Sequence, residues 1–169
     1  MALSDSTLTQ EKIKEVLHYD LDTGVFVWLK RTSVRIMIGD TAGCVSKNGY
    51  YQIKALNIVS YAHRLAFLYM TGEWPKDQVD HINHIKTDNR WCNLRASTDK
   101  ENRKNMPRQK NNTSGVNGVG WDSSRKKWIS CIKINSKAIH LGRFSNFFDA
   151  VCARKSAENK YGFHSNHGT

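Results

Sequence analysis

The sequence has few of the residues that characterise disulfide-rich or membrane-spanning proteins. Its 169 residues include four cysteines and two prolines, and nowhere do as many as 18 apolar residues follow one another. No two cysteines lie closer than 21 residues (Cys131 and Cys152), so no C-x-x-C pair is present to anchor a structural zinc. Residues 1–12 contain no apolar run suited to export. We therefore expect a cytoplasmic protein with reduced, mostly buried thiols and no membrane partner.

Acidic residues are also scarce. Fifteen Asp and Glu against 26 Lys and Arg give a formal net charge of +11, and this excess is unevenly distributed. Residues 1–94 carry a net charge of +1, whereas residues 95–133 carry 10 basic against 3 acidic side chains and residues 134–169 carry 5 against 2. A local positive field favours a polyanionic partner, of which nucleic acid is the commonest. The alternative, on charge alone, is that the basic residues only keep a small protein soluble.

The apolar content of 39% can supply the cores of one ordinary domain or two small ones. The first third predicts a small α+β unit from its apolar periodicity and its turn residues. The expected elements are a helix over residues 8–19 capped by Thr7 or Thr9, a strand over 25–30, a hairpin turning at Asn48-Gly49, a strand over 57–61, and a helix over 62–71 that stops at Gly72.

The remainder predicts two further groups of elements. Strands over residues 78–82 and 92–96 should enclose a polar loop, followed by a helix over 99–106 that begins with a capping box and ends at Pro107. After a basic linker, the expected elements are strands over 116–121, 127–134 and 138–144 and a helix within 145–162 that ends at Gly162. The predicted fold class is α+β throughout.

The polar loop lies within "VDHINHIKTDNRWCNLR", which contains two carboxylates, two histidines and three asparagines. Phosphodiester hydrolysis needs an activated water and a group that stabilises charge on the leaving oxygen. The Asp80 carboxylate can bind a hard divalent cation, and the His81 imidazole can accept a proton near neutral pH. Asn102 offers a second oxygen ligand, and Asn93 offers a hydrogen bond that orients His81. The alternative is a polar loop without chemistry.

Two features of this stretch limit its interpretation. Successive residues of a regular strand point to opposite faces, so Asp80 and His81 can address one phosphate only at a strand end. His81 and His84 form a His-x-x-His pair, to which Cys92 adds a third zinc ligand. A fourth ligand is missing, so we interpret His84 as a loop histidine near phosphates.

The same stretch, followed by "TDKENRKN", resembles the HNH endonucleases, in particular the phage and intron homing type in which asparagine replaces the last histidine of the motif. The resemblance extends upstream through "YDLDTGVFVW", "NGYYQI" and "AHRLAFLYMTGEWP". Downstream, "SGVNGVGW" and the residues as far as "AENKYG" resemble the APETALA-type DNA-binding domain, in which three strands read DNA and a helix backs the sheet.

The resemblance implies a ββα-metal nuclease centre. It assigns Asp80 and Asn102 as ligands of one metal ion, His81 as the general base and Asn93 as the residue that orients it. Two oxygen ligands without a ring nitrogen favour Mg²⁺ or Mn²⁺ over zinc, and no other small-molecule cofactor is implied. The expected products carry 5′-phosphate and 3′-hydroxyl ends.

Basic and aromatic residues are predicted to contact DNA. Structural roles stay open for several of them: helix packing or an internal salt bridge for Arg64, a structural role of unspecified kind for Arg90 and Arg95, and core packing for Trp128. Gly120, Cys131 and His140 depart from the side chains of plant APETALA members, so the plant recognition site does not transfer. The predicted DNA-binding residues are Arg64, Arg90, Arg95, Arg103, Lys104, Arg108, Lys110, Trp121, Arg125, Lys127, Lys133 and Arg143.

We therefore predict a nuclease domain over residues 1–106, a basic linker over 107–114 and an APETALA-type domain over 115–169. The expected partner is double-stranded DNA, and the expected state is a monomer, with a dimer as the alternative. A non-catalytic DNA-binding regulator with a decayed nuclease core is the competing function. An RNA-directed nuclease is a third, because the motif does not exclude a 2′-hydroxyl group.

Overall fold

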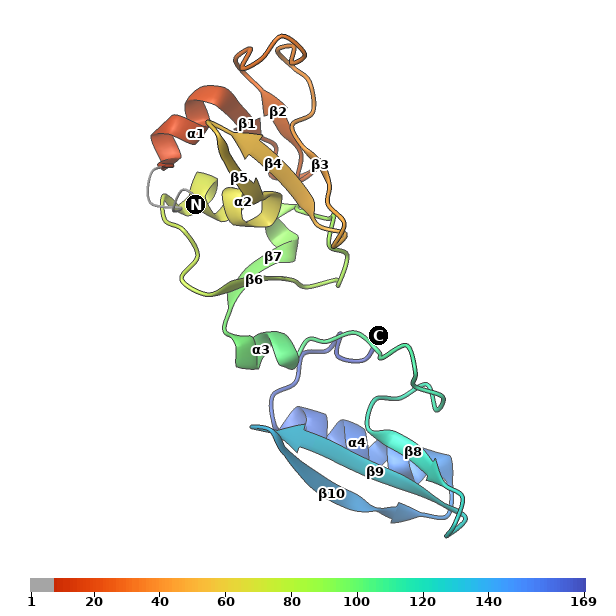
Figure 1. Ribbon diagram of the computed structural model, residues 1–169. Helices are drawn as coiled ribbons and strands as arrows, with labels where there is room; N and C mark the ends of the chain where they lie inside the picture. The colour runs from red at the N-terminus through yellow and green to blue at the C-terminus, as the bar shows by residue number, and fades with distance from the viewer. Residues whose placement is uncertain (1–7) are drawn as a thin grey trace. The chain divides into compact units, whose positions relative to one another are not determined.

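The computed structural model describes residues 8–169, and the chain divides into two compact units, Met1–Thr98 and Asp99–Thr169 (Figure 1). Short helices and small antiparallel sheets occur in both units, so the predicted α+β class is confirmed. Thr7, one of the two expected helix caps, lies outside the described residues. Within residues 8–169, no helix is both long and apolar enough to cross a membrane.

The first unit is built from two helices and three small sheets. Strand β1 pairs with β2, β4 lies between β3 and β5, and β6 pairs with β7. The elements are α1 (Gln10–Val16), β1 (Leu17–Tyr19), β2 (Phe26–Trp28), β3 (Cys44–Val45), β4 (Tyr51–Ala55), β5 (Ile58–Tyr61), α2 (Ala62–Thr71), β6 (Gln78–His81), a 3₁₀ turn (Trp91–Asn93) and β7 (Leu94–Ser97).

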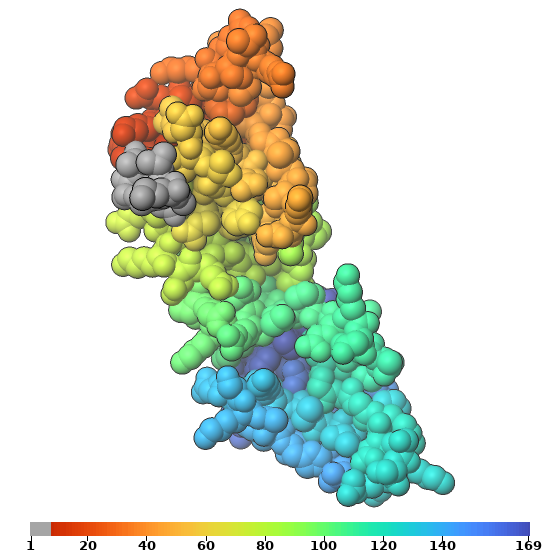
Figure 2. Space-filling model, in the orientation of Figure 1, coloured from red at the N-terminus to blue at the C-terminus, as the bar shows by residue number. Residues whose placement is uncertain are grey.

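One apolar core connects these pieces. Both helices and the first two sheets contribute, and the largest fully buried side chains are Ile13, Leu17, Phe26, Ile53, Leu65 and Leu68. The same core reaches β6 through Val79 and β7 through Leu94. The β6–β7 hairpin is therefore anchored to the rest of the unit by buried apolar contacts, the dominant favourable term in folding. By contrast, the orange segment between β2 and β3 projects from the surface of this unit (Figures 1 and 2).

Four sequence predictions for the first unit meet different outcomes. Thr9 caps α1, and Gly72 ends α2 with a positive φ of 81°, both as expected. The predicted helix over residues 8–19 is too long, because Leu17–Tyr19 pairs with β2 instead. The predicted hairpin at Asn48-Gly49 is confirmed by the pairing of β3 with β4. Its turn is longer than the two-residue type, because only Gly49 has a positive φ and the loop closes through a Ser46 N–H bond to the Tyr50 carbonyl at 2.8 Å.

The two-residue hairpin turns occur elsewhere, at Leu56-Asn57 and Asn135-Ser136, where both residues have φ between 48° and 67°. Positive φ at two central positions is what a type I′ turn requires.

The second unit is a three-stranded sheet backed by one long helix. Strand β9 (Lys127–Ile134) lies between β8 (Val119–Asp122) and β10 (Lys137–Phe144), and α4 (Phe147–Lys160) packs against all three strands (Figure 1). The predicted strands and helix are thereby confirmed. On α4, Ala150 and Ala157 are buried and allow close approach to the sheet.

Helix α3 (Asp99–Arg103) opens the second unit and is shorter than predicted. The amides of Lys104 and Asn105 bond to carbonyls three residues back, as in a tightened last turn. Pro107 disfavours helical geometry at the residue before it, which explains why the helix ends ahead of Met106. The expectation of mostly buried thiols is wrong: three of the four cysteines are exposed, and Cys131 is half-buried.

Candidate active site

Asp80 and His81 occupy the end of strand β6, as their proposed joint action requires. The two strands pair antiparallel, with Asp80 opposite Arg95 and His81 opposite Leu94. His81 is the last residue of β6, and the chain then leaves the sheet in a loop over residues 82–90. Both side chains are buried, with 7% of Asp80 and 5% of His81 exposed.

The Asp80 carboxylate is paired with an arginine on the neighbouring strand. Its Oδ2 accepts hydrogen bonds from Nε of Arg95 at 3.0 Å and from Nη2 at 2.7 Å. Hydrogen bonds from two guanidinium N–H groups to one carboxylate are among the stronger charged hydrogen bonds. Any cation that binds Asp80 must therefore share this carboxylate with Arg95.

His81 is held by an asparagine that the sequence reasoning did not assign to it. Nε2 of His81 lies 3.1 Å from Oδ1 of Asn89, whose own amide nitrogen donates to the Thr87 carbonyl at 3.3 Å. An amide oxygen can only accept, so Nε2 carries the hydrogen and Nδ1 of neutral His81 carries the lone pair. Burial lowers the pKa of His81, against the opposing effect of the Asn89 hydrogen bond. The imidazole is therefore neutral at pH 7.

Asn93 braces the loop that begins directly after His81. Its amide nitrogen donates to Oδ1 of Asn83 at 3.0 Å and to the Asp88 carbonyl at 2.8 Å, and its Oδ1 accepts from the Asn83 amide at 3.0 Å. Its backbone carbonyl also accepts from the amide of Ile82 at 2.9 Å. Asn93 thus acts on the chain on the C-terminal side of His81, and its assignment as an orienting residue stays a prediction.

Asp88 and Arg90 close the same loop with a second ion pair. Nη2 of Arg90 lies 2.6 Å from Oδ2 of Asp88, and this partner lowers the pKa of Asp88 to about 2. Asn83 donates to the same oxygen at 2.6 Å. Asp88 therefore stabilises the loop conformation as a carboxylate at all moderate pH values.

The turn between β1 and β2 supports the loop from the other side. Tyr19 donates its hydroxyl to the Asn89 carbonyl at 2.6 Å, and the Leu21 carbonyl accepts from the Trp91 amide at 2.9 Å. Gly24 has a φ of +74°, and a Cβ there would lie 2.4 Å from the backbone of Asn89 and Arg90. This close approach requires glycine, so the "DLDTG" turn contributes to the site by positioning Asn89.

A second buried histidine packs against His81. The rings of His63 and His81 meet edge to face with centroids 5.0 Å apart, and Tyr61 stacks on His63 at 5.5 Å. His63 is 6% exposed, and its Nδ1 has no hydrogen-bond partner among the described residues. Burial, and secondarily His81, lowers the pKa of His63 to about 3. Its position on α2 predicted only a helix residue, because the contact with His81 is not local.

The depressed pKa of His63 predicts how stability depends on pH. The unfolded chain binds a proton at His63 below about pH 6.5, whereas the folded chain resists it down to about pH 3, so stability is lost as the pH falls through that window. In urea titrations, the free energy of unfolding of the parent should fall as the pH decreases. In His63→Gln this fall should be less steep, with a slope smaller than that of the parent by about 1 kcal/mol per pH unit. His18→Gln, which removes an exposed histidine, is the control, and equal slopes for both variants would contradict the prediction.

The predicted DNA-contacting arginines of the first unit all have partners within it. Arg64 donates to the Asp77 carbonyl at 3.1 Å and lies over the Trp74 ring at 5.8 Å. Arg90 and Arg95 form the two ion pairs with Asp88 and Asp80. The structure thus gives Arg90 and Arg95 structural roles in ion pairs, and DNA contact by these residues stays a prediction.

The second unit contains the remaining predicted residues. Asn102 is half-buried on α3, and its role as a metal ligand beside Asp80 stays a prediction. Arg103 pairs with Asp99, and Lys104 donates to the Tyr161 carbonyl at 2.7 Å. Arg108 donates to the Gly115 carbonyl at 3.4 Å. Lys110, Lys127 and Lys133 are exposed, as are Arg103, Arg108, Arg125 and Arg143.

Aromatic residues line the sheet of the second unit. Trp121 is 51% exposed and meets Trp128 edge to face at 5.2 Å, and Trp128 in turn meets Phe147 at 4.7 Å. Asp122 lies within 3.8 Å of two predicted DNA-binding residues, Arg125 and Arg143. Trp128 is half-buried, in agreement with its expected packing role, whereas Trp121 presents a ring to solvent.

The donor chemistry of the predicted ligands suits a hard cation. A carboxylate and an amide oxygen are the ligand types that Mg²⁺ and Mn²⁺ prefer. Among residues 8–169, no three His, Cys, Asp or Glu side chains gather into a metal-binding group. The assignment of Asp80 and Asn102 as ligands of one ion therefore stays a prediction.

Known proteins share part of this chain. Residues 60–104, which include α2, β6, the loop and β7, match the HNH endonuclease family model. A stretch of 67 residues is 36% identical to Protein 3.8 of Escherichia phage T7, covering 39% of this chain and 55% of that protein. The chain thus spans about half the length of the curated relative it matches. No solved structure matches it significantly.

Proposed function

We propose that the protein is a metal-dependent endonuclease of the phage and intron homing type that hydrolyses phosphodiester bonds in double-stranded DNA. The observation that carries the proposal is the Asp80-His81 pair at the end of β6, inside the segment that matches the HNH endonuclease model. The proposed products carry 5′-phosphate and 3′-hydroxyl ends.

In this proposal His81 is the general base. Its Nε2 is committed to Asn89, so Nδ1 is the atom that takes the proton from the attacking water. Burial keeps the ring neutral, and a neutral ring is the form that can accept a proton. Asn93, Asp88 and the β1–β2 turn hold the loop that carries Asn89, and thereby hold the base in one orientation.

Asp80 and Asn102 are the proposed ligands of one Mg²⁺ or Mn²⁺ ion. Such an ion, when bound, stabilises negative charge on the phosphate and on the leaving oxygen. Arg95, the ion-pair partner of Asp80, is the proposed contact of a phosphate oxygen.

The second unit is the proposed DNA-binding module. Residues 99–169 contain 14 Lys and Arg against 5 Asp and Glu, and the exposed ring of Trp121 lies on the same small sheet as Lys127 and Lys133. Cationic side chains interleaved with aromatic rings suit phosphates and base edges. We retain the APETALA-type resemblance of residues 115–169 as part of this proposal.

A plasmid assay tests the activity directly. Supercoiled plasmid incubated with the protein and Mg²⁺ should become nicked or linear, and an excess of EDTA should prevent this. Plasmid that stays supercoiled at all protein concentrations would favour the DNA-binding regulator instead. Labelled RNA of the same sequence, tested in parallel, decides whether the substrate extends to RNA.

Salt dependence of binding tests the role of the second unit. Lys127→Gln should lower the slope of log affinity against log salt concentration by about 0.9, the value for one phosphate contact. Lys30→Gln, which removes an exposed lysine of the first unit that pairs with Glu15, should leave the slope unchanged. Fluorescence anisotropy with a labelled duplex measures both. Parallel lines for Lys127→Gln and the parent would argue against DNA contact by this sheet.

A further inference from the structure

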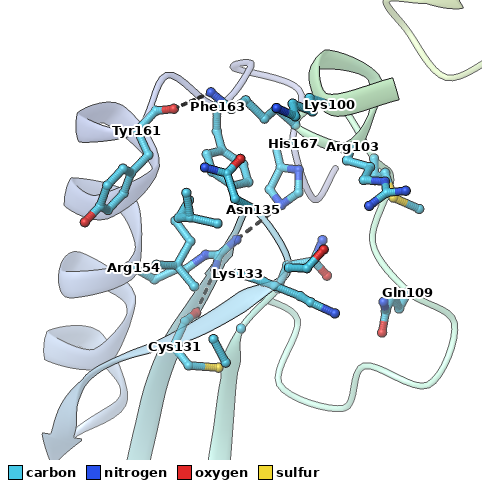
Figure 3. A pocket seen from close by; sticks show the side chains of 18 of the residues that line it. Lys100, Arg103, Gln109, Cys131, Lys133, Asn135, Arg154, Tyr161, Phe163 and His167 are labelled. Carbon is cyan, nitrogen blue, oxygen red and sulfur yellow. Dashed lines mark hydrogen bonds between the residues drawn. The ribbon is translucent and has the colours of Figure 1, made fainter. Parts of the chain in front are cut away.

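The second unit contains a cavity of about 860 Å³ that is open to solvent on one side (Figure 3). Its walls come from α3, the segments over residues 106–112 and 117–118, strand β9, the β9–β10 turn, the middle of α4 through Arg154 and residues 161–167. This volume lies in the range of small-molecule and cofactor sites. None of the predicted catalytic residues lines it.

The lining of the cavity is strongly basic. Lys100, Arg103, Lys104, Lys133 and Arg154 all contribute to it, whereas no Asp or Glu is found among its described lining residues. Lys100 and Lys133 are exposed, so their charges face water at the cavity rim. Arg103 and Arg154 are already paired with Asp99 and Glu158, whereas the two exposed lysines add positive charge that favours an anion at the rim.

Arg154 forms the buried part of this lining. It is 4% exposed, and it donates from Nε to Glu158 at 2.8 Å and from Nη1 to the Cys131 carbonyl at 2.6 Å, while Nη2 lies 3.2 Å from Nε2 of His167. Figure 3 shows its guanidinium between Cys131 and His167. These bonds use three of the five N–H hydrogens, which leaves one on each Nη nitrogen.

Backbone and aromatic contacts fix the position of this guanidinium. Gly118 has a φ of +75°, and a Cβ there would lie 2.3 Å from the Cys131 carbonyl oxygen and 2.7 Å from Nη1 of Arg154, so glycine lets the backbone approach the carbonyl to which Arg154 donates. The ring of Phe163 lies 5.5 Å from Cζ of Arg154 and 6.0 Å from Nζ of Lys104. His167 meets Phe163 edge to face at 4.7 Å. Arg154 is thus a preorganised donor rather than a mobile surface charge.

We propose that this cavity binds a phosphate ester, with Arg154 as the directional donor and Lys133 and Lys100 as the neighbouring charges. A guanidinium presents parallel N–H groups that match two phosphate oxygens, and lysines add charge without fixed geometry. The phosphate ester belongs either to a DNA strand or to a free nucleotide. If the phosphate belongs to a DNA strand, the inference rests on the proposed function. If it belongs to a free nucleotide, the inference is independent of the proposed function.

The test follows the Nε–H signal of Arg154 by ¹H–¹⁵N NMR in the full chain. This hydrogen is buried against Glu158, and loss of the signal in Arg154→Lys assigns it. Thymidine 5′-monophosphate should shift the signal along a saturating curve, and sodium chloride at the same ionic strength should not. A short DNA duplex is the second probe. A shift with the duplex identifies a polynucleotide as the source of the phosphate, and a shift with the nucleotide alone identifies a free nucleotide.

Substitution of single lysines separates the cavity from general positive charge. Either the nucleotide or the duplex will shift the Arg154 signal, and Lys133→Gln should lower the affinity for that probe about tenfold. This is the scale of one lost charged hydrogen bond. Lys137→Gln removes an exposed lysine of β10 that does not line the cavity, and should leave binding unchanged. The inference would be overturned if both substitutions weakened binding of the probe equally. It would also be overturned if sodium chloride shifted the Arg154 signal as much as thymidine 5′-monophosphate does. Neither result involves plasmid cleavage, so failure of the proposed nuclease function is recognised separately.

Discussion

Replacing His81 by alanine is expected to lower the rate of plasmid cleavage by about 10²- to 10⁴-fold, the usual contribution of a general base. The reason is specific to this chain: burial keeps the imidazole neutral, and Asn89 commits Nε2, so Nδ1 is the proton acceptor. DNA affinity should stay close to that of the parent, because His81 is proposed to contact water rather than to hold the strand. Single-turnover cleavage and duplex binding measure the two quantities.

A neighbouring histidine supplies the matched control for His81→Ala. His84 lies in the same loop with a φ of 64°, and His84→Asn keeps a residue that tolerates this conformation. This variant should cleave at nearly the parental rate. Thermal unfolding of both variants shows whether either has lost its fold. If folded His81→Ala cleaves as fast as the parent, His81 is not the base.

Replacing Asp80 by asparagine is expected to reduce the rate of cleavage by at least about 100-fold, because even residues that only support metal ligands contribute up to about 100-fold. The residual activity should also need a higher Mg²⁺ concentration. The substitution keeps the size of the side chain and removes its charge. It also weakens the pair with Arg95, so the folded state must be checked by thermal unfolding. Cleavage measured over a range of Mg²⁺ concentrations distinguishes a lost ligand from a lost fold, because added metal restores activity only in the first case.

Asp88→Asn is the matched control for Asp80→Asn. Asp88 is also paired with an arginine in the same hairpin, but it is not a proposed ligand. Its loss should lower stability, because its carboxylate fixes the loop through Arg90 and Asn83, and should leave the Mg²⁺ dependence unchanged. A shift in Mg²⁺ dependence of the same size in both variants would contradict the assignment of Asp80.

Local patterns predicted much of the fold because the forces that select these elements act over a few residues. The apolar face of α2 and its stop at Gly72, and the alternation along β9, are both present as expected. The errors occur where tertiary contacts overrule local preference. Leu17–Tyr19 continues a helical pattern, yet it forms β1 because pairing with Phe26–Trp28 buries Leu17 and Tyr19 in the core. The expectation of buried thiols is wrong for the same reason, because the burial of a cysteine depends on tertiary packing and not on its spacing from other cysteines in the sequence.

The sequence by itself determined which residue types are available for chemistry: the Asp80-His81 pair, the asparagines around it, and the excess of basic residues after residue 94. Residue order also predicted that the pair lies at a strand end, since regular pleating separates successive side chains. Only the tertiary structure decided which partners these residues have. Tyr19 and Asn89 are 70 residues apart in the chain and 2.6 Å apart in space, and His63 packs against His81 from a different element. Such pairings depend on how separate elements pack, and no local pattern of residues encodes them.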